Sequence, residues 1–347
     1  MSLTTIATKT GHAAQLNGQP ESAAARIAIV GGGGAMGGLF GALLAKSGHS
    51  VTAVDVSLAA VEAINRNGLR FEGADGKIES VRFKATTNPG EVGLVDLVLI
   101  MVKSLHTEAA ARASLPFIGP RTSVLTLQNG WGNAPKLQAI LGSQRVLAGI
   151  TVHSGTLVGP GHVRHAGIGP ATIGELDGQI SNRVRSIARI LAATGEVHVS
   201  PEIVKVIWSK LCLNVCALPA CALLRFYSGE LLKHESLLEL MRALLRETVA
   251  VATAQGISLD FDERWAAITA QLAKASTVRA SMLQDVEARR CTEIGAINGA
   301  VVEAAHRLGI PVPHNETLVW LIRALDASFA PDYKPATPPS LPAATTL

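Results

Sequence analysis

The chain of 347 residues is long enough for two domains, and 48% of its residues are apolar, which is ample for a sizeable core. Only 17% of the residues are charged, and the formal net charge of +4 comes from basic residues scattered along the chain. This pattern excludes a basic stripe for nucleic acid and a polybasic membrane anchor. The four cysteines form no CxxC pair, so we expect free thiols in a reducing, cytoplasmic compartment.

The two ends of the chain differ from the rest. Residues 1–25 lack the basic and hydrophobic segments of a secretory signal, so we expect a flexible leader. Residues 331–347 are rich in Pro, Ala and Thr, and we expect a disordered tail. Between them we expect a first domain at 26–200 and a second at 201–330.

The first predicted elements form a strand, a turn, a helix and a second strand. An apolar strand begins at Ile27, a glycine-rich turn follows, and the second strand, 51–54, ends in Asp55. The uncharged run 27–45 is long enough for a membrane span, but its glycines divide it into a strand and a helix.

The glycine turn matches the dinucleotide-binding fingerprint GxGxxG at Gly32, Gly34 and Gly37. The glycines allow a tight turn, close approach of the backbone to a pyrophosphate, and close packing of helix and strand. Backbone N–H groups at the helix start, where Ala35 and Met36 lie, favour phosphate binding. We predict a Rossmann unit, with the register open by one residue because four glycines are consecutive.

Strands and helices continue to alternate to about residue 200. We expect them at 57–65 (helix), 69–84 (polar strands), 95–102 (strand), 106–114 (helix), 123–127 (strand), 135–141 (helix) and 146–152 (strand). This alternation predicts a parallel, doubly wound sheet. The glycine-punctuated segment 155–174 predicts antiparallel strands that extend the sheet edge, followed by a helix at 181–193 and a strand near 197.

From Pro201 onward the pattern is helical. Apolar residues recur at helical spacing in 237–249 and 294–308, Pro311 and Pro313 end the latter helix, and a last helix covers 316–327. We therefore expect an α/β fold: a Rossmann-type doubly wound sheet with antiparallel edge strands, followed by an all-α C-terminal domain. Ligands of such sheets bind at the carboxyl ends of the strands, here facing the second domain.

Two polar residues follow predicted strands. Lys103 comes directly after the strand that ends in Val102, and Asn129 follows the strand that ends near Leu127. Both would lie beside a bound nicotinamide. The alternative is a surface lysine and a turn asparagine, since Asn-Gly is a common turn pair.

Lys210 and Asn214 share one face of an otherwise apolar helix because they are four residues apart. The lysine either extends to the surface or points into a cleft. Partial burial would lower its pKa and make it a proton donor near neutral pH.

Three further positions have structural explanations from sequence alone. Ser281, with Gln284 three residues on, fits a helix capping box. Glu293 would open the helix 294–308, where an acidic side chain favours the helix dipole. His162 and His165 should face opposite sides of a strand, so we expect no metal site there.

Taken together, these motifs resemble the ketopantoate reductase (2-dehydropantoate 2-reductase) family over roughly residues 26–325. The resemblance rests on the glycine turn and on five further segments: MVKSLHT (101–107), LQNGWG (127–132), IWSKLCLN (207–214), SMLQD (281–285) and RRCTEIGAINGAVV (289–302). It implies reduction of a 2-keto acid by a nicotinamide cofactor, as for ketopantoate in pantothenate biosynthesis.

The resemblance also implies roles for individual residues. Lys210 would protonate the keto oxygen during hydride transfer, and Glu293 would orient the substrate hydroxyl. Asn214 and Ser281 would hold the substrate, while Lys103 and Asn129 would lie near the nicotinamide and the reacting carbonyl. A cation with a proton to give suits the charge that develops on that oxygen.

Two positions depart from the family pattern. Members that use NADPH have a basic residue after the second strand, whereas this chain has Asp55, which can accept a hydrogen bond from a ribose and repels a 2′-phosphate. We therefore predict a preference for NADH, with NADPH possible. One turn past Asn214 the family has a polar residue and this chain has Leu218, so the substrate could be a more apolar 2-keto acid.

Two alternatives stay open at this point. A β-hydroxyacid dehydrogenase also joins a Rossmann domain to helices and uses a lysine. A non-catalytic nucleotide sensor would keep the fold and lose the chemistry, although the presence of Lys210, Asn214, Ser281 and Glu293 together argues against it. The helical half has enough apolar surface for a homodimer but does not require one.

Overall fold

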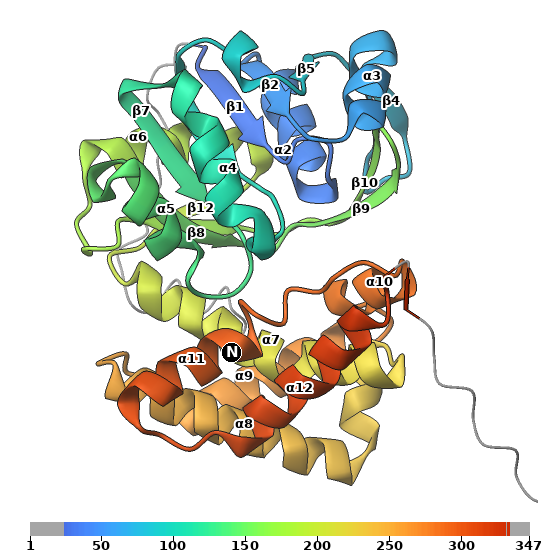
Figure 1. Ribbon diagram of the computed structural model, residues 1–347, viewed down its shortest axis with the longest axis vertical. Coiled ribbons are helices and arrows are strands. Elements are labelled where there is room, and N and C mark those ends of the chain that lie inside the picture. The colour runs from blue at the N-terminus through green and yellow to red at the C-terminus, as the bar shows by residue number, and fades with distance from the viewer. Residues whose placement is uncertain (1–23, 331, 334–347) are drawn as a thin grey trace, which may run out of the picture.

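The computed structural model describes residues 24–330 and 332–333 (Figure 1). The flexible leader and disordered tail that we expect at the two ends therefore fall almost entirely outside the described residues. The described part contains an N-terminal α/β sheet domain and a helical C-terminal domain.

The main sheet has eight strands in the order β12-β11-β8-β7-β6-β1-β2-β5. Its strands are β1 (Arg26–Val30), β2 (Ser50–Val54), β5 (Lys84–Thr86), β6 (Val95–Ile100), β7 (Ile118–Thr126), β8 (Val146–Thr151), β11 (Ala171–Gly174) and β12 (Val197–Val199). Pairing is parallel from β5 to β8, and β11 pairs antiparallel with β8 and parallel with β12. The expected doubly wound sheet with an antiparallel edge is confirmed.

Helices cover both faces of this sheet because the central strands are apolar on both sides. The helices of this domain are α2 (Ala35–Lys46), α3 (Leu58–Asn67), α4 (Thr107–Ser114), α5 (Asn133–Leu141) and α6 (Asn182–Leu191). In β1, Ile27 and Ile29 belong to the core formed with α2, α3 and α6. Ala28 and Val30 belong to the core formed with α4 and α5, as strand alternation requires.

The segment 155–174 is only partly an extension of the sheet edge, which corrects the sequence prediction. Of its three strands, only β11 joins the main sheet. The other two, β9 (Ser154–Gly159) and β10 (His162–Gly167), form a second sheet in the order β4-β3-β10-β9 with β3 (Leu69–Glu72) and β4 (Ile78–Val81). This small sheet packs on α2, where Gly38 leaves room for Val163, so β10 buries an apolar side chain against a helix instead of pairing with the edge.

The C-terminal domain consists of α7 (Ile203–Leu224), α8 (Glu235–Ala254), α9 (Phe261–Lys274), α10 (Ser281–Glu287), α11 (Asn298–Leu308) and α12 (Pro313–Ala327). Short 3₁₀ helices connect elements in both domains: 89–91, 104–106, 115–117, 143–145, 192–194 and 228–233. The predicted helix 294–308 is too long, because residues 294–297 form a turn before α11. Gly309, in the left-handed conformation, ends α11, while Pro313 begins α12.

α7 connects the two domains. Its first residues, Ile203 and Ile207, belong to a core of the sheet domain, whereas Trp208 and the turns that follow lie in the helical core. By length and composition α7 could cross a membrane, but 72% of its most apolar stretch is buried inside the protein. It is the central helix of the C-terminal domain.

A proline interrupts the hydrogen bonding of α7. Pro219 has no N–H, so the carbonyl of Val215 loses its helical partner. The side chain of Asn298 in α11 donates to that carbonyl instead, at 3.3 Å. The same amide nitrogen also donates to Asn315 in α12, at 3.1 Å, and all three helices are thereby linked.

Candidate active site

The glycine turn has the geometry of the fingerprint in the register Gly32, Gly34 and Gly37. A Cβ atom on Gly32 would lie 2.5 Å from the Cβ of Ala53, and one on Gly37 would lie 2.1 Å from the carbonyl oxygen of Gly31. Gly34 is the N-cap of α2. Glycine is therefore required at positions 32 and 37, as the predicted fingerprint needs at its tight turn and at its helix–strand contact.

The start of α2 fits a dinucleotide pyrophosphate. Gly34 offers no side-chain cap, and the first turn contains no acidic residue. The first helical bond runs from Gly38 to Gly34, so the N–H groups of Ala35 and Met36 precede it. These N–H groups and the helix dipole favour a negatively charged ligand.

Asp55 lies next to this turn. One carboxylate oxygen accepts the N–H of Gly33 at 2.8 Å, and the other accepts the N–H of Ser57 at 2.9 Å. The two backbone bonds hold the carboxylate at the end of β2, where Asp55 remains partly exposed. A fixed negative charge therefore stands beside the glycine turn.

Lys210 lies where α7 meets the C-terminal ends of β7 and β8. Its Nζ donates to the side-chain oxygen of Asn129 at 2.9 Å and to the main-chain oxygen of Thr151 at 2.8 Å. Burial lowers the pKa of Lys210 to about 8, although the negative charge of Glu293 acts in the opposite direction. An ammonium group has three N–H donors, so one is left for a further acceptor.

A second group of charges bridges the domains through Lys103. Its Nζ lies 2.5 Å from a carboxylate oxygen of Asp285 in α10 and 3.7 Å from one of Glu293. The other oxygen of Glu293 accepts the backbone N–H of Ser104 at 2.9 Å. Arg290 adds a longer contact to Asp285, at 3.5 Å. Lys103 and Glu293, which the sequence places 190 positions apart, are thus neighbours.

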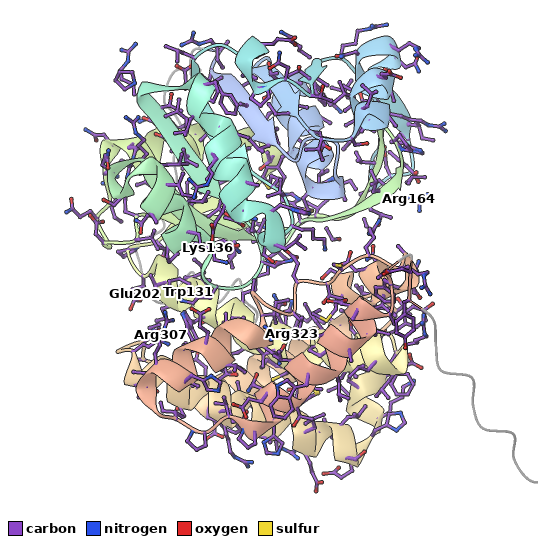
Figure 2. The ribbon with its side chains drawn as sticks, viewed as in Figure 1. Trp131, Lys136, Arg164, Glu202, Arg307 and Arg323 are labelled. Carbon is purple, nitrogen blue, oxygen red and sulfur yellow. The ribbon has the colours of Figure 1, made fainter. Side chains whose placement is uncertain are left out.

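The loop 127–132 after β7 contacts the helical domain directly. The N–H of Trp131 donates to the carbonyl of Ala296 at 2.8 Å. A Cβ on Gly130 would lie 2.1 Å from the same carbonyl oxygen, so the close approach requires glycine. Figure 2 shows Trp131 at one end of the boundary between the domains and Arg164 of β10 at the other.

The remaining predicted substrate residues are less closely connected. Asn214 lies one turn after Lys210, is 7% exposed, and has no side-chain hydrogen bond to another described residue. Leu218, a further turn on, is partly buried against the helical core. Ser281 is exposed at the start of α10, and it does not cap that helix. The capping box is therefore wrong, since Ala280 is the N-cap and Gln284 donates to Arg279.

Within residues 24–330, no group of three or more His, Cys, Asp or Glu side chains is arranged to bind a metal ion. His165 faces inward and its Nε2 lies 3.0 Å from Nδ1 of His153. His162 lies on the other face of β10, with its Nε2 at 3.8 Å from Glu72.

Sequence reasoning missed several partners of the site. Thr151 and Ser104 act through a main-chain carbonyl and a main-chain N–H, which any residue type could supply. Asp285 stands in the segment SMLQD, but only the fold shows that its buried carboxylate meets Lys103.

The Rossmann sheet has a helix without a side-chain cap at its glycine turn, and it faces a helical domain that presents a partly buried lysine. Together these features define a nicotinamide-dependent oxidoreductase. The chain belongs to the ketopantoate reductase family. Residues 27–178 match the family model "Ketopantoate reductase PanE/ApbA", and residues 202–326 match "Ketopantoate reductase PanE/ApbA C terminal". It is an oxidoreductase that acts on a 2-keto acid with a nicotinamide cofactor.

Relatives and solved structures agree with this assignment. The 2-dehydropantoate 2-reductase of Halobacterium salinarum is 35% identical over 301 residues, which cover 85% of this chain and 97% of that protein. The crystal structure of a PanE/ApbA family ketopantoate reductase from Ralstonia eutropha JMP134 has 34% identity and a TM-score of 0.80, covering 87% of this chain and 99% of that one. The ternary structure of D-mandelate dehydrogenase with NADH and anilino(oxo)acetate has 27% identity, a TM-score of 0.83 and the same coverage.

Proposed function

We propose that this enzyme reduces an apolar 2-keto acid to the 2-hydroxy acid and that Lys210 is its general acid. When bound, the reduced nicotinamide supplies the hydride to C2 of the substrate. Lys210 donates a proton to the keto oxygen through the N–H that Asn129 and Thr151 leave free. A pKa of about 8 suits this role, because the lysine is protonated at neutral pH yet gives up its proton readily. The third N–H group of Lys210, which has no acceptor among these partners, is the main observation in support of the proposal.

The surrounding residues would orient the substrate. The side-chain oxygen of Asn129 accepts from Lys210, so its amide nitrogen is available to a substrate oxygen. The amide of Asn214, one turn along α7, faces the same side as Lys210 and would bind the substrate. Glu293 is held by Ser104 and would accept a hydrogen bond from a hydroxyl group. We retain Ser281 as a substrate ligand from the family pattern, and Lys103 as a neighbour of the nicotinamide.

We propose NADH as the preferred cofactor. Both oxygens of Asp55 are fixed by backbone N–H groups, so the carboxylate cannot turn away from a 2′-phosphate without losing them. A ribose 2′-hydroxyl can donate to such a carboxylate, whereas a phosphate is repelled. We expect NADH to bind more tightly than NADPH in a direct titration, and Asp55→Asn to narrow the difference. Tighter binding of NADPH by the native chain would refute this preference.

We propose a substrate more apolar than ketopantoate. Leu218 cannot bond a distal hydroxyl of the substrate, and a site without that bond no longer rejects acids that lack the hydroxyl. D-mandelate dehydrogenase, a structural relative, is bound to anilino(oxo)acetate, whose acid carries an aromatic group. Other relatives are 2-dehydropantoate 2-reductases. Ketopantoate is therefore the reference substrate, and activity with any apolar 2-keto acid must be compared with activity on ketopantoate.

The decisive experiment measures NADH and NADPH oxidation with ketopantoate and with branched and aromatic 2-keto acids. We expect the apolar acids to have the higher kcat/KM, and Leu218→Asn to shift the preference toward ketopantoate. A kcat/KM far higher for ketopantoate would refute the substrate proposal and leave the chemistry intact. Tight NADH binding without turnover of any 2-keto acid would refute the catalytic proposal.

We further propose that the enzyme acts in the cytoplasm on a small molecule, without nucleic acid or membrane partners, and that any homodimer forms through the helical domain. All four cysteines are free thiols, which suits a reducing compartment.

A further inference from the structure

The hydrogen bond from Lys210 to Asn129 joins residues 81 positions apart, from different domains. Asn129 belongs to a loop, and a loop side chain holds a lysine in place only if its main chain is itself fixed. A chain of polar side chains beneath this loop provides that support. It consists of Thr107 at the start of α4, Gln128 in the loop and Asn133 at the start of α5, and we call it the loop network.

Each donor atom of the loop network has at least one acceptor. The Nε2 of Gln128 donates to the carbonyl of Val102 at 2.8 Å and to the hydroxyl of Thr107 at 2.9 Å. Thr107 in turn donates to Oδ1 of Asn133 at 2.9 Å, and Nδ2 of Asn133 donates to the main-chain carbonyl of Asn129 at 3.0 Å.

Two main-chain carbonyls determine the direction of these bonds. A carbonyl only accepts, so the amide nitrogen of Gln128 must face Val102 and that of Asn133 must face Asn129. The single hydroxyl hydrogen of Thr107 then has one acceptor, Oδ1 of Asn133. The orientations of both amides and of the hydroxyl are therefore determined. Thr107 and Asn133 are buried, so water cannot replace their hydrogen bonds without a cost in free energy.

We infer that Thr107, Gln128 and Asn133 are positioning residues for the proton donor, because they fix the main chain from which Asn129 holds Lys210 toward the substrate. The inference rests on the proposed role of Lys210. The bond from Trp131 to Ala296 fixes the other side of the loop against the helical domain. Neither Thr107 nor Asn133 is among the residues that would touch substrate or cofactor.

Loss of the loop network has a defined kinetic signature. Once Asn129 moves away, the protonated form of Lys210 loses an acceptor and its proton leaves at lower pH. In a pH profile of kcat/KM, the alkaline limb would then move to lower pH by about half a unit or more, and kcat/KM at neutral pH would fall about tenfold. The KM for NADH would be unchanged, since Asp55 and the glycine turn are not affected.

The test compares four variants with the native enzyme. Thr107→Val and Asn133→Leu break the loop network with little change in side-chain size and without adding a charge. Thr107→Ser keeps the hydroxyl and should restore the native profile. Thr122→Val is the matched control, because Thr122 also has a buried hydroxyl. Its partners, Val95 and Gly119, lie at the N-terminal ends of β6 and β7, away from the site at the C-terminal ends.

We expect the alkaline limb to move in Thr107→Val and Asn133→Leu and to stay in place in Thr107→Ser and Thr122→Val, whatever the melting temperatures. If Thr107→Val does not fold, Asn133→Leu decides alone. An unmoved limb in the folded variants would overturn the inference and reduce these residues to structural support. Lys210→Met tests the general-acid role of Lys210 separately from the role of the loop network. If this variant retains the alkaline limb and native activity, the proposed role of Lys210 is wrong.

Discussion

Two lysines stand at the boundary between the domains in opposite surroundings. Lys210 has neutral oxygen partners, Asn129 and Thr151, and burial lowers its pKa to about 8. Lys103 remains partly exposed and faces two carboxylates, those of Asp285 and Glu293. Neutral acceptors stabilise an ammonium group less than carboxylates do, so they orient it while leaving its proton easier to remove. The difference teaches that one lysine is suited to proton donation and the other to joining the domains.

Replacing each lysine by methionine should show the difference between their roles most clearly. We expect Lys210→Met to lower kcat by about 10²- to 10⁴-fold, because general acid catalysis is lost. Lys103→Met should lower kcat less than about tenfold, since Glu293 keeps its bond to Ser104. Steady-state kinetics with the best 2-keto acid, together with NADH binding to confirm an intact cofactor site, measure both effects. Equal losses would show that the two lysines share one role.

The pH dependence should separate the lysines further. Lys210 is protonated below its pKa of about 8 and donates its proton there, so the rate of reduction should fall as the pH rises above about 8, by up to tenfold per unit. The same limb should persist in Lys103→Met. A profile of kcat/KM from pH 6 to 10 tests this expectation, and a limb that disappears with Lys103 would contradict it.

The smallest effects concern stability and should have opposite signs. The pKa of Lys210 is lower in the folded chain, about 8, than the 10.5 of a free lysine, so its burial as a cation costs free energy below pH 8, a cost that diminishes as the pH rises toward 10.5. Lys210→Met should therefore raise the free energy of unfolding at pH 7, by as much as about 3 kcal/mol. Lys103→Met should lower it by about 1 kcal/mol, because the buried carboxylate of Asp285 keeps only the long contact to Arg290. Urea unfolding at pH 7 and 9 measures both, and changes of the same sign would refute the comparison.

The elements that the sequence predicts well are those with a local cause. Alternating apolar residues identify β1, glycines identify the turn before α2, and Lys210 stands out because its helix has almost no other charge. These signals lie within a few residues of the feature that they predict.

The features that the sequence does not predict depend on distant partners. Nothing near 155–167 indicates that β9 and β10 leave the main sheet to pack on α2. The helical spacing of Ile294 and Ile297 continues into α11, so the turn that aims Glu293 at Ser104 is hidden. Ser281 and Gln284 have the spacing of a capping box but not its geometry. A capping serine directly precedes its helix, whereas Ser281 is the first residue of α10.

The substitute hydrogen bond in α7 has a consequence for synthesis of the chain. The carbonyl of Val215 accepts its hydrogen bond from the side chain of Asn298, and the ribosome adds that residue 83 positions later. Until then the turn around Pro219 has an unsatisfied carbonyl and must stay open or hydrated. The sheet domain can fold while translation continues, but the helical domain reaches its final form only after α11 has emerged. Nascent chains that stop before residue 298 lack this hydrogen bond, and we expect them to expose the apolar surface of α7 that the last two helices cover.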